Sequence, residues 1–155
     1  MEKAIFFSGC GTAYSVGTDN FTKKNLELYP ETVPALRFLR RRGYLPVLIS
    51  PELQEYKLFQ SSLKDKTLMP EYWNGREEDL DILLEEQLIN VQESYFITDG
   101  CYMQEWLQLG WRTILVLTGK GVATLDSLKT GQLEKICDVC KDIYAAAISI
   151  VIHKY

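Results

Sequence analysis

The chain has 155 residues, of which 46% are hydrophobic and 25% charged, and its formal net charge is −4. This length suits a single core, so we expect residues 1–155 to form one domain. The acidic balance argues against a nucleic-acid partner, and no apolar run approaches the roughly 20 residues of a membrane span. One histidine, His153, is present, which excludes most zinc hydrolases and Ser-His-Asp enzymes. The apolar run 4–7 is too short for a secretory signal, so we expect a cytoplasmic location and four reduced cysteines.

Apolar runs alternate with amphipathic stretches along the chain. Residues 4–7 predict a buried strand that ends at a glycine-rich turn, and the polar stretch that follows, to about Tyr29, predicts a loop or flap. Gly43 marks the end of the first helix. Residues 77–88 predict an amphipathic helix whose apolar face contains Leu80, Leu83, Leu84 and Leu88. Strands are predicted at 4–7, 44–49, 95–97, 113–117 and 136–139, helices at 32–42, 51–63, 77–88, 102–110 and 142–150, and irregular chain at 64–75.

This alternation of strands and helices is typical of βαβ units, which build a mostly parallel sheet. In such sheets the ligand crevice lies beyond the carboxyl ends of the strands. The segments at those ends are residues 8–12, Ser50, residues 99–101 and residues 118–121. We therefore expect these four segments to meet at the functional site.

The motifs at these ends carry a resemblance to a known family. KAIFFSGCGT, residues 3–12, resembles the first motif of the histidinol-phosphate and heptose-bisphosphate phosphatases of the haloacid dehalogenase-like (HAD-like) superfamily, a strand ending in Asp-x-Asp-Gly-Thr. Residues 30–50, 94–100, 111–121 and 139–150 resemble later segments of that group, in the same order. The resemblance implies an α/β fold: one HAD-like Rossmannoid domain with a mostly parallel sheet, helices on both faces, and a cap and zinc loop that are absent or minimal.

The family's reaction is a metal-assisted phosphoryl transfer, and the resemblance places unusual residues at its two central positions. The first aspartate of the motif attacks phosphorus, and the second is the general acid–base. Ser8 stands at the nucleophile position and Cys10 at the acid–base position. A hydroxyl without an adjacent base is a poor nucleophile, and a thiol is a soft ligand with an ordinary pKa of about 8.5. The resemblance therefore implies that both positions are inactive.

The remaining family positions are partly retained. Ser50 supplies the phosphate-binding hydroxyl, and Asp99 keeps one metal carboxylate, which we regard as vestigial. The lysine of the third motif falls near Asn74, and Arg76 is its possible substitute; Met103 stands where a second acidic residue is common. We expect Gly11, Thr12, Ser50 and Arg76 to bind phosphate, with backbone N–H groups of residues 9–12 pointing into the crevice. No cofactor is expected beyond weakly bound Mg²⁺.

These departures favour a catalytically inactive phosphatase homologue, a pseudo-phosphatase, that acts as a binding or regulatory module. The expected partner is a small anion or phosphorylated metabolite, with no nucleic acid and no membrane; a protein partner is left open. One alternative is an active hydrolase with an unorthodox Ser8/Cys10 site, whose base would be Asp19, Asp99 or Glu105. Another is an interaction protein that works through its outer surface.

The cysteines allow two further interpretations. Cys137 and Cys140 have the spacing of half a zinc site or a redox pair, but the second half-site is missing, and a core strand is the simpler explanation. Cys10 and Cys101 both follow strands that are neighbours in the family. They are either small structural thiols or a reactive pair.

Overall fold

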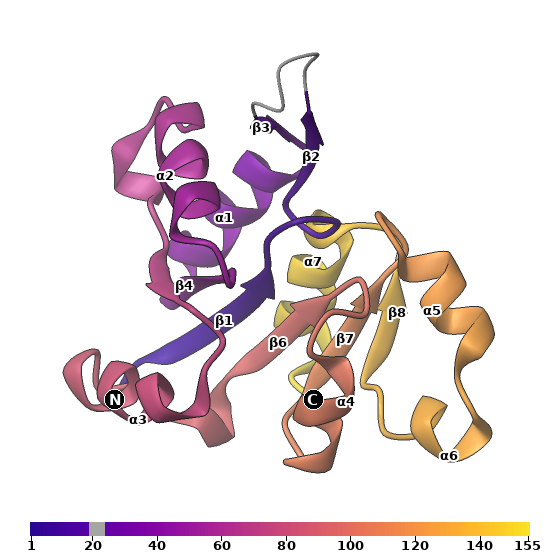
Figure 1. Ribbon diagram of the computed structural model, residues 1–155. Helices are drawn as coiled ribbons and strands as arrows, with labels where there is room; N and C mark the ends of the chain where they lie inside the picture. The colour runs from indigo at the N-terminus through magenta and orange to yellow at the C-terminus, as the bar shows by residue number, and fades with distance from the viewer. Residues whose placement is uncertain (19–23) are drawn as a thin grey trace.

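A computed structural model describes residues 1–18 and 24–155. Its main sheet has the strand order β5-β4-β1-β6-β7-β8, and each neighbouring pair is parallel. Residues 14–28, predicted as a loop or flap, contain a separate antiparallel hairpin, β2 and β3 (Figure 1). The strands are β1 (Lys3–Ser8), β2 (Tyr14–Thr18), β3 (Lys24–Leu28), β4 (Tyr44–Ile49), β5 (Glu71–Trp73), β6 (Tyr95–Thr98), β7 (Thr113–Val116) and β8 (Asp138–Cys140).

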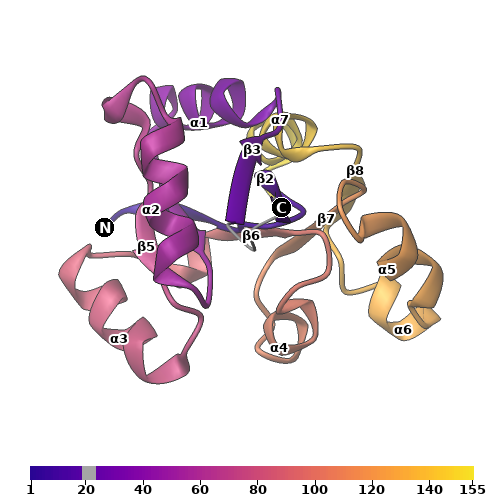
Figure 2. The same cartoon turned by 45° about the horizontal axis from the view of Figure 1, so that its top comes forward.

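Helices cover both faces of this sheet, as predicted. Figure 2 shows α1 and α7 on one face and α3 and α4 on the other. The α-helices are α1 (Thr32–Arg41), α2 (Leu53–Ser62), α3 (Glu77–Glu86), α4 (Met103–Gln108), α5 (Gly121–Ser127), α6 (Thr130–Leu133) and α7 (Ile143–His153), and short 3₁₀ turns occupy Lys66–Leu68 and Val91–Glu93. Within the described residues, each helix is too short or too polar to cross a membrane.

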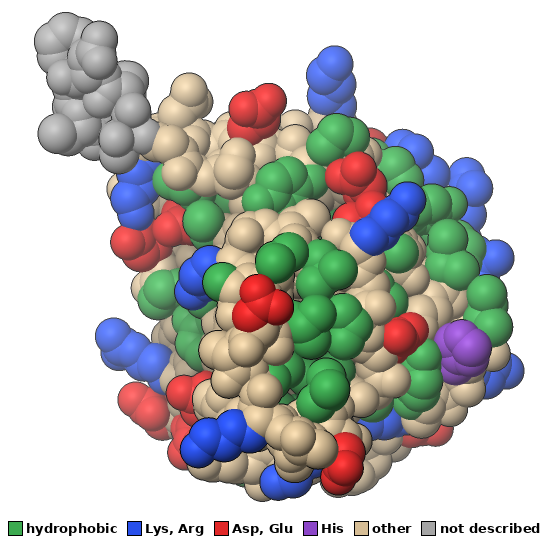
Figure 3. Space-filling model, turned by 90° about the vertical axis from the view of Figure 1, so that its right-hand side faces the viewer, with side chains coloured by type: hydrophobic (Ala, Val, Ile, Leu, Met, Phe, Trp, Pro, Cys, Tyr) green, Lys and Arg blue, Asp and Glu red, His purple; other side chains and the backbone are tan. Residues whose placement is uncertain are grey.

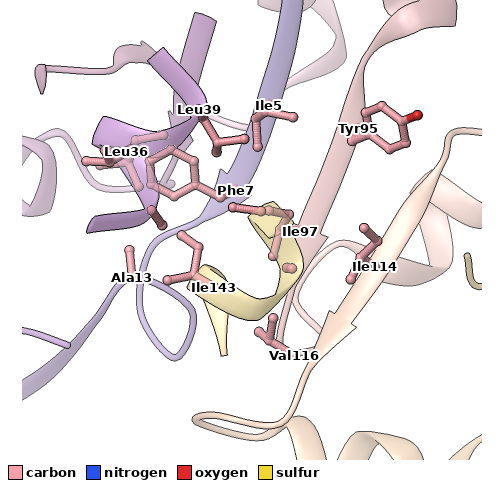
Figure 4. Packing of buried hydrophobic residues seen from close by; sticks show 14 of the residues in the cluster. Ile5, Phe7, Ala13, Leu36, Leu39, Tyr95, Ile97, Ile114, Val116 and Ile143 are labelled. Atoms are coloured by element: carbon pink, nitrogen blue, oxygen red, sulfur yellow. The ribbon is translucent and has the colours of Figure 1, made fainter. Parts of the chain in front are cut away.

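The central strand β1 explains why the core has two halves. Ile5 and Phe7 pack under α1 and α7 with Leu36 and Ile143 (Figure 4). Phe6 points the other way, where it stacks on Phe96 with ring centroids 4.6 Å apart. Because neighbouring side chains of a strand face opposite sides, a strand covered on both sides must be apolar throughout. The run AIFF, residues 4–7, meets that requirement.

Three details differ from the sequence predictions. The segment 64–75, predicted as irregular, contains β5 at the edge of the sheet. Helices α5 and α6 were not predicted, because both are short and polar residues interrupt their apolar spacing. Leu88 does not belong to the buried face of α3: it follows the helix at φ 55° and is 63% exposed.

Apolar side chains gather on the face that α5 and α6 form, as Figure 3 shows. Val122 and Leu133 are 56% and 45% exposed there, beside the half-buried Leu125 and Ile136. The edge strand β8 lies next to this face.

A polar cluster joins β8 to the last residues of the chain. The Asp138 carboxylate accepts hydrogen bonds from the Ser149 hydroxyl at 2.6 Å and the Tyr155 hydroxyl at 3.0 Å. The backbone N–H of Val139 donates to its other oxygen at 2.8 Å. Burial alone would raise the pKa of Asp138, but these hydrogen bonds together outweigh it and lower the pKa below the usual 3.8.

Asp138→Asn is expected to lower the free energy of unfolding at pH 7 by about 1 kcal/mol, because the hydroxyls lose a charged acceptor. A carboxyl with a lowered folded-state pKa stabilises the fold above its unfolded pKa of about 3.9, and this contribution is lost as the pH falls through the folded value. The difference in the free energy of unfolding between Asp138→Asn and wild type, measured in urea titrations, should therefore shrink below about pH 4. Asp126→Asn, at an exposed position on α5, is the control. A difference in unfolding free energy that does not depend on pH would show that the ionised Asp138 carboxylate is not the source of the stabilisation.

Candidate functional site

The loops after the parallel strands meet at one end of the sheet, as predicted. They enclose a cleft of about 160 Å³, whose lining includes Ser8, Cys10, Ser50, Glu55 and Cys101. The loop after β7 joins this group through Thr118, whose hydroxyl donates to the Gly11 carbonyl at 2.6 Å. The topology therefore brings together residues that are more than a hundred positions apart in the sequence.

The Ser8 hydroxyl lies in a chain of hydroxyl groups and is 2% exposed. It donates to the Thr98 hydroxyl at 3.2 Å, and Thr98 in turn donates to the Cys101 carbonyl at 2.7 Å. Because Ser8 uses its proton toward Thr98, it accepts from the Thr12 hydroxyl at 2.6 Å. Thr12 itself accepts from the backbone N–H of Asp99 at 3.1 Å. The proton of Ser8 thus points to another hydroxyl and not to a base.

The glycines of the first loop are explained by close packing. A Cβ atom on Gly9 would lie 2.1 Å from the Tyr14 hydroxyl, and one on Gly11 would lie 2.0 Å from Oδ2 of Asp99. Gly11 also has a φ of 92°, which favours glycine. A Cβ on Gly119 would approach the same Asp99 oxygen at 2.6 Å. The Gly9-Cys10-Gly11 pattern therefore serves the packing of Tyr14 and Asp99.

Asp99 is 1% exposed and lies behind these glycines. Its Oδ2 accepts a hydrogen bond from the Lys120 backbone N–H at 3.0 Å. Its Oδ1 is buried and has no hydrogen-bond partner among the described residues. A carboxylate oxygen without a partner is the kind of atom that a cation would satisfy, so the neighbouring donors decide whether a metal fits.

Those donors do not fit a resident Mg²⁺ ion. Mg²⁺ prefers oxygen ligands and carboxylates in octahedral geometry. Ser8 offers a neutral hydroxyl that is already hydrogen-bonded, and Cys10 offers a soft sulfur. No group of three or more His, Cys, Asp or Glu side chains placed to hold a metal occurs among the described residues. Asp99 alone remains of the ligand set that the resemblance implies.

Glu55 is a site residue that the sequence prediction missed. It comes from α2, lines the cleft, and its side chain is 12% exposed. Its Oε1 accepts from the Tyr14 hydroxyl at 3.0 Å, and its Oε2 lies 3.5 Å from Nζ of Lys24 on the hairpin. Lys24 also pairs with Glu52. The periodicity of α2 does not show which of its polar residues faces a loop from another part of the chain.

Cys10 is exposed and lines the same cleft. Partial burial raises the pKa of its thiol, and the negative charges of Glu55 and Asp99 raise it further. The thiol is therefore protonated at neutral pH, and a protonated thiol is neither a nucleophile nor a general base.

The proposed phosphate-binding side chains are dispersed. The Ser50 hydroxyl lies at the cleft but is engaged in a local turn with the backbone of Glu52, at 3.2 Å. Arg76 is exposed and is not part of the cleft lining. Asn74, at the position of the family lysine, donates to the Asp79 carboxylate at 2.6 Å. Sequence spacing alone does not distinguish a side chain at the cleft from one that faces solvent.

Three of the four backbone amides of residues 9–12 are not arranged as expected. The N–H groups of Gly9, Gly11 and Thr12 donate to the carbonyls of Ile49, Tyr14 and Gly9 at 3.1, 2.8 and 3.1 Å. They do not point into the crevice as unpaired donors, because the tight turn uses them itself. An anion in the cleft would have to compete with these bonds.

Of the bases named for a Ser8/Cys10 enzyme, the two within the described residues have no side-chain hydrogen bond to Ser8 or Cys10. Asp99 is linked to Ser8 only through its backbone N–H and the Thr12 hydroxyl. Glu105 is exposed on α4 and does not line the cleft. Asp19 lies outside the described residues.

Lys120 is a cation at this end of the sheet. Its Nζ lies 3.5 Å from Sγ of Cys101, which is half-buried. The neighbouring Cys101 side chain raises the pKa of Lys120 above its usual 10.5, so the lysine is protonated at neutral pH. This thiol–ammonium contact has no counterpart in the mechanism that the family resemblance implies.

The other cysteines and the tryptophans are structural. Cys140 is buried beside Asp138, where burial raises the pKa of its thiol to about 12, and burial also raises the pKa of Cys137. Trp73 and Trp106 are 5% and 2% exposed and belong to the core on the α3 and α4 face.

No model of a known protein family matches the sequence, and no curated protein matches it either. Solved structures do. A D,D-heptose 1,7-bisphosphate phosphatase from B. bronchiseptica, complexed with magnesium and phosphate, has a TM-score of 0.69 at 16% identity, over 97% of this chain and 98% of that one. The corresponding protein from Burkholderia thailandensis has a TM-score of 0.68 at 17% identity, over 97% of this chain and 99% of that one.

A third structure, 3-deoxy-D-manno-octulosonate 8-phosphate phosphatase from Moraxella catarrhalis with magnesium, phosphate and KDO, has a TM-score of 0.68 at 12% identity. The match covers 99% of this chain and 86% of that one. At such low identity the likeness concerns the fold alone. The chain has a HAD-like fold, as its sequence predicts.

Proposed function

We propose that this protein is a catalytically inactive homologue of the HAD-like phosphatases that acts as a binding or regulatory module. The observation that carries the proposal is the hydroxyl chain around Ser8. Its proton is directed to Thr98, and that chain ends at the Cys101 carbonyl, which accepts no proton at neutral pH. Ser8 is therefore not activated for attack on phosphorus.

The acid–base and the metal site of the phosphatase mechanism are missing as well. Cys10, at the acid–base position, has a raised pKa and lies near Glu55 and Asp99, so it cannot exchange a proton readily near pH 7. The donors around Asp99 do not fit Mg²⁺, so we derive no step through a metal. What the cleft retains is a small, partly open space at the carboxyl end of the sheet.

For the ligand we propose a small anion or a phosphorylated metabolite. Two structural neighbours were determined in complex with magnesium and phosphate, and Lys120 supplies a positive charge beside the cleft through its contact with Cys101. Glu55 opposes an anion, because its carboxylate lines the cleft. A few neutral hydrogen bonds and one cation correspond to roughly millimolar affinity.

A calorimetric titration with inorganic phosphate tests this proposal. Binding in the millimolar range is expected, unchanged by EDTA and weakened by Ser50→Ala. Ser61→Ala, at an exposed position on α2, is the matched control. Glu55→Gln should tighten binding several-fold, because it removes a charge of the same sign as the ligand. If phosphate gives no heat with either wild type or Glu55→Gln, the cleft is not an anion site.

One observation favours the alternative of an active enzyme. Cys10 and Glu55 line the same cleft, so a carboxylate that the sequence prediction did not include is available as a base. In this version Glu55 would remove the Cys10 proton. The raised pKa of Cys10 opposes this alternative. The negative charge of Glu55 disfavours the Cys10 thiolate, which is the species that Glu55 would have to create as a base.

A further inference from the structure

Four arginines lie close together at the end of α1, away from the cleft. This arginine cluster consists of Arg37, Arg40, Arg41 and Arg42, in a chain whose net charge is −4. Because α1 leads into β4 at the amino end of that strand, the cluster lies at the opposite end of the sheet from the cleft. Both ion pairs found among the described residues involve Lys24, so none of the four arginines pairs with a carboxylate there.

The surface around the cluster is hollowed. A cavity of about 370 Å³ lies between α1 and the 3₁₀ turn Lys66–Leu68, and its lining includes Arg37, Arg40 and Arg41. A second cavity, of about 190 Å³, is lined in part by Arg37, Arg41 and Arg42. The two cavities adjoin at Arg37 and Arg41, which line both. The larger one has the volume of a small-molecule pocket.

Arg40 carries a partly buried charge without a counter-ion among the described residues. Its side chain is half-buried, and its Nη2 donates to the Met69 carbonyl at 2.6 Å. Its Nε is buried and has no hydrogen-bond partner in the described part of the chain. Proteins normally pair the charges that they bury, because burial removes hydration. The unpaired guanidinium therefore makes the neighbouring cavity positive.

Two other contacts define the edges of this site. The Arg42 guanidinium lies 3.7 Å from the centroid of the Phe38 ring, which orients it beside the smaller cavity. Asp65 also lines the larger cavity, and its Oδ1 accepts from the N–H and the hydroxyl of Thr67 at 3.0 and 2.6 Å. Asp65 opposes an anion, but the described lining holds three guanidinium groups against this one carboxylate.

From this arrangement we propose that the arginine cluster binds a small molecule with two or more linked phosphate groups. Guanidinium groups hold phosphate through paired hydrogen bonds, and several of them together match several charges on one ligand. The helix dipole explains basic residues in a last turn, but it explains neither the cavities that they line nor the unpaired charge of Arg40. Hollows of this size favour a compact ligand over a lipid surface or a nucleic acid.

The experiment is a calorimetric titration of the full chain with tripolyphosphate at low ionic strength. A Kd of roughly 10–100 μM is expected, with orthophosphate at least tenfold weaker. The double variant Arg37→Gln, Arg41→Gln should weaken tripolyphosphate binding at least tenfold, because both side chains line both cavities. The double variant Lys129→Gln, Lys135→Gln removes the same charge at exposed positions near α6 and is the matched control.

Two further measurements place the ligand. Ser50→Ala, in the cleft, should leave tripolyphosphate binding unchanged. Tripolyphosphate should also protect Arg37 and Arg41 from modification by phenylglyoxal, mapped by mass spectrometry, while the exposed Arg76 reacts as before. Replacing both cluster arginines with lysine keeps the charge and should recover part of the affinity. Circular dichroism of each variant excludes unfolding as the cause of weaker binding.

The proposal is wrong if tripolyphosphate gives no heat, if orthophosphate binds as tightly, or if the lysine control weakens binding as much as the arginine variant. Loss of binding in Ser50→Ala would place the ligand in the cleft and also contradict it. Binding of phosphatidylserine vesicles or duplex DNA that depends on Arg37 and Arg41, without binding of tripolyphosphate, would assign the cluster to a macromolecular polyanion and overturn the proposal.

Discussion

Purified protein with Mg²⁺ is expected to hydrolyse 4-nitrophenyl phosphate, histidinol phosphate and heptose bisphosphate no faster than background. Loss of a covalent nucleophile lowers kcat by on the order of 10⁴–10⁶, and loss of the acid–base by roughly 10²–10⁴, without simple additivity. The family resemblance places Ser8 and Cys10 at these two positions. The Ser8 proton is directed to Thr98, and burial and the charge of Glu55 raise the pKa of the Cys10 thiol.

The control is the same assay on Ser8→Ala and on Cys10→Ala, which should give the same background rate as wild type. Turnover above about 1 s⁻¹ that disappears in either variant would show an active enzyme and overturn the proposal. A loss of turnover that is confined to Cys10→Ala and Glu55→Gln would identify the alternative enzyme in which Glu55 is the base for Cys10, because these two side chains share the cleft.

Gly11→Ala is expected to lower the free energy of unfolding by about 2–5 kcal/mol, measured by urea denaturation. Two effects add. The new Cβ would lie 2.0 Å from a buried Asp99 oxygen, and the φ of 92° is unfavourable for alanine. Gly17→Ala is the matched control, because a Cβ there meets nothing within 4 Å.

A second background separates the two effects. Asp99→Ala removes the oxygen that a Cβ on Gly11 would strike, so the steric part of the cost should disappear while the backbone part remains. Gly11→Ala is then expected to cost about 1–3 kcal/mol less in the Asp99→Ala background than in wild type. Equal costs in both backgrounds would show that the carboxylate does not contact the loop as described.

The fold could be predicted from the sequence because its signals are local. The apolar strands β1, β4, β6 and β7 and the helices α1 and α3 have clear periodicity or punctuation. The short elements β5, α5 and α6 do not, since three to seven residues give too few repeats to define a period. Their structure depends on the sheet to which they are attached.

The candidate site was less predictable, because its properties depend on contacts between distant segments. The positions of Ser8, Cys10, Ser50 and Asp99 at the strand ends follow from the motifs. The hydrogen bonds that occupy the loop amides do not, and neither does the presence of Glu55 in the cleft. The amide bonds arise from the turn itself and its contact with the end of β4, and Glu55 reaches the cleft because α2 packs against β3. No local sequence pattern records either contact.

The position of β1 in the centre of the sheet also determines the order in which the chain can fold during synthesis. Strand β1 is made first, yet its two neighbours are β4 and β6, and the register with β6 pairs Ile5 with Tyr95. Until that residue has been made, one edge of an apolar strand stays without its partner. Nascent chains of intermediate length therefore leave the apolar segment AIFF, residues 4–7, without one of its partner strands, which favours aggregation more than the finished fold does.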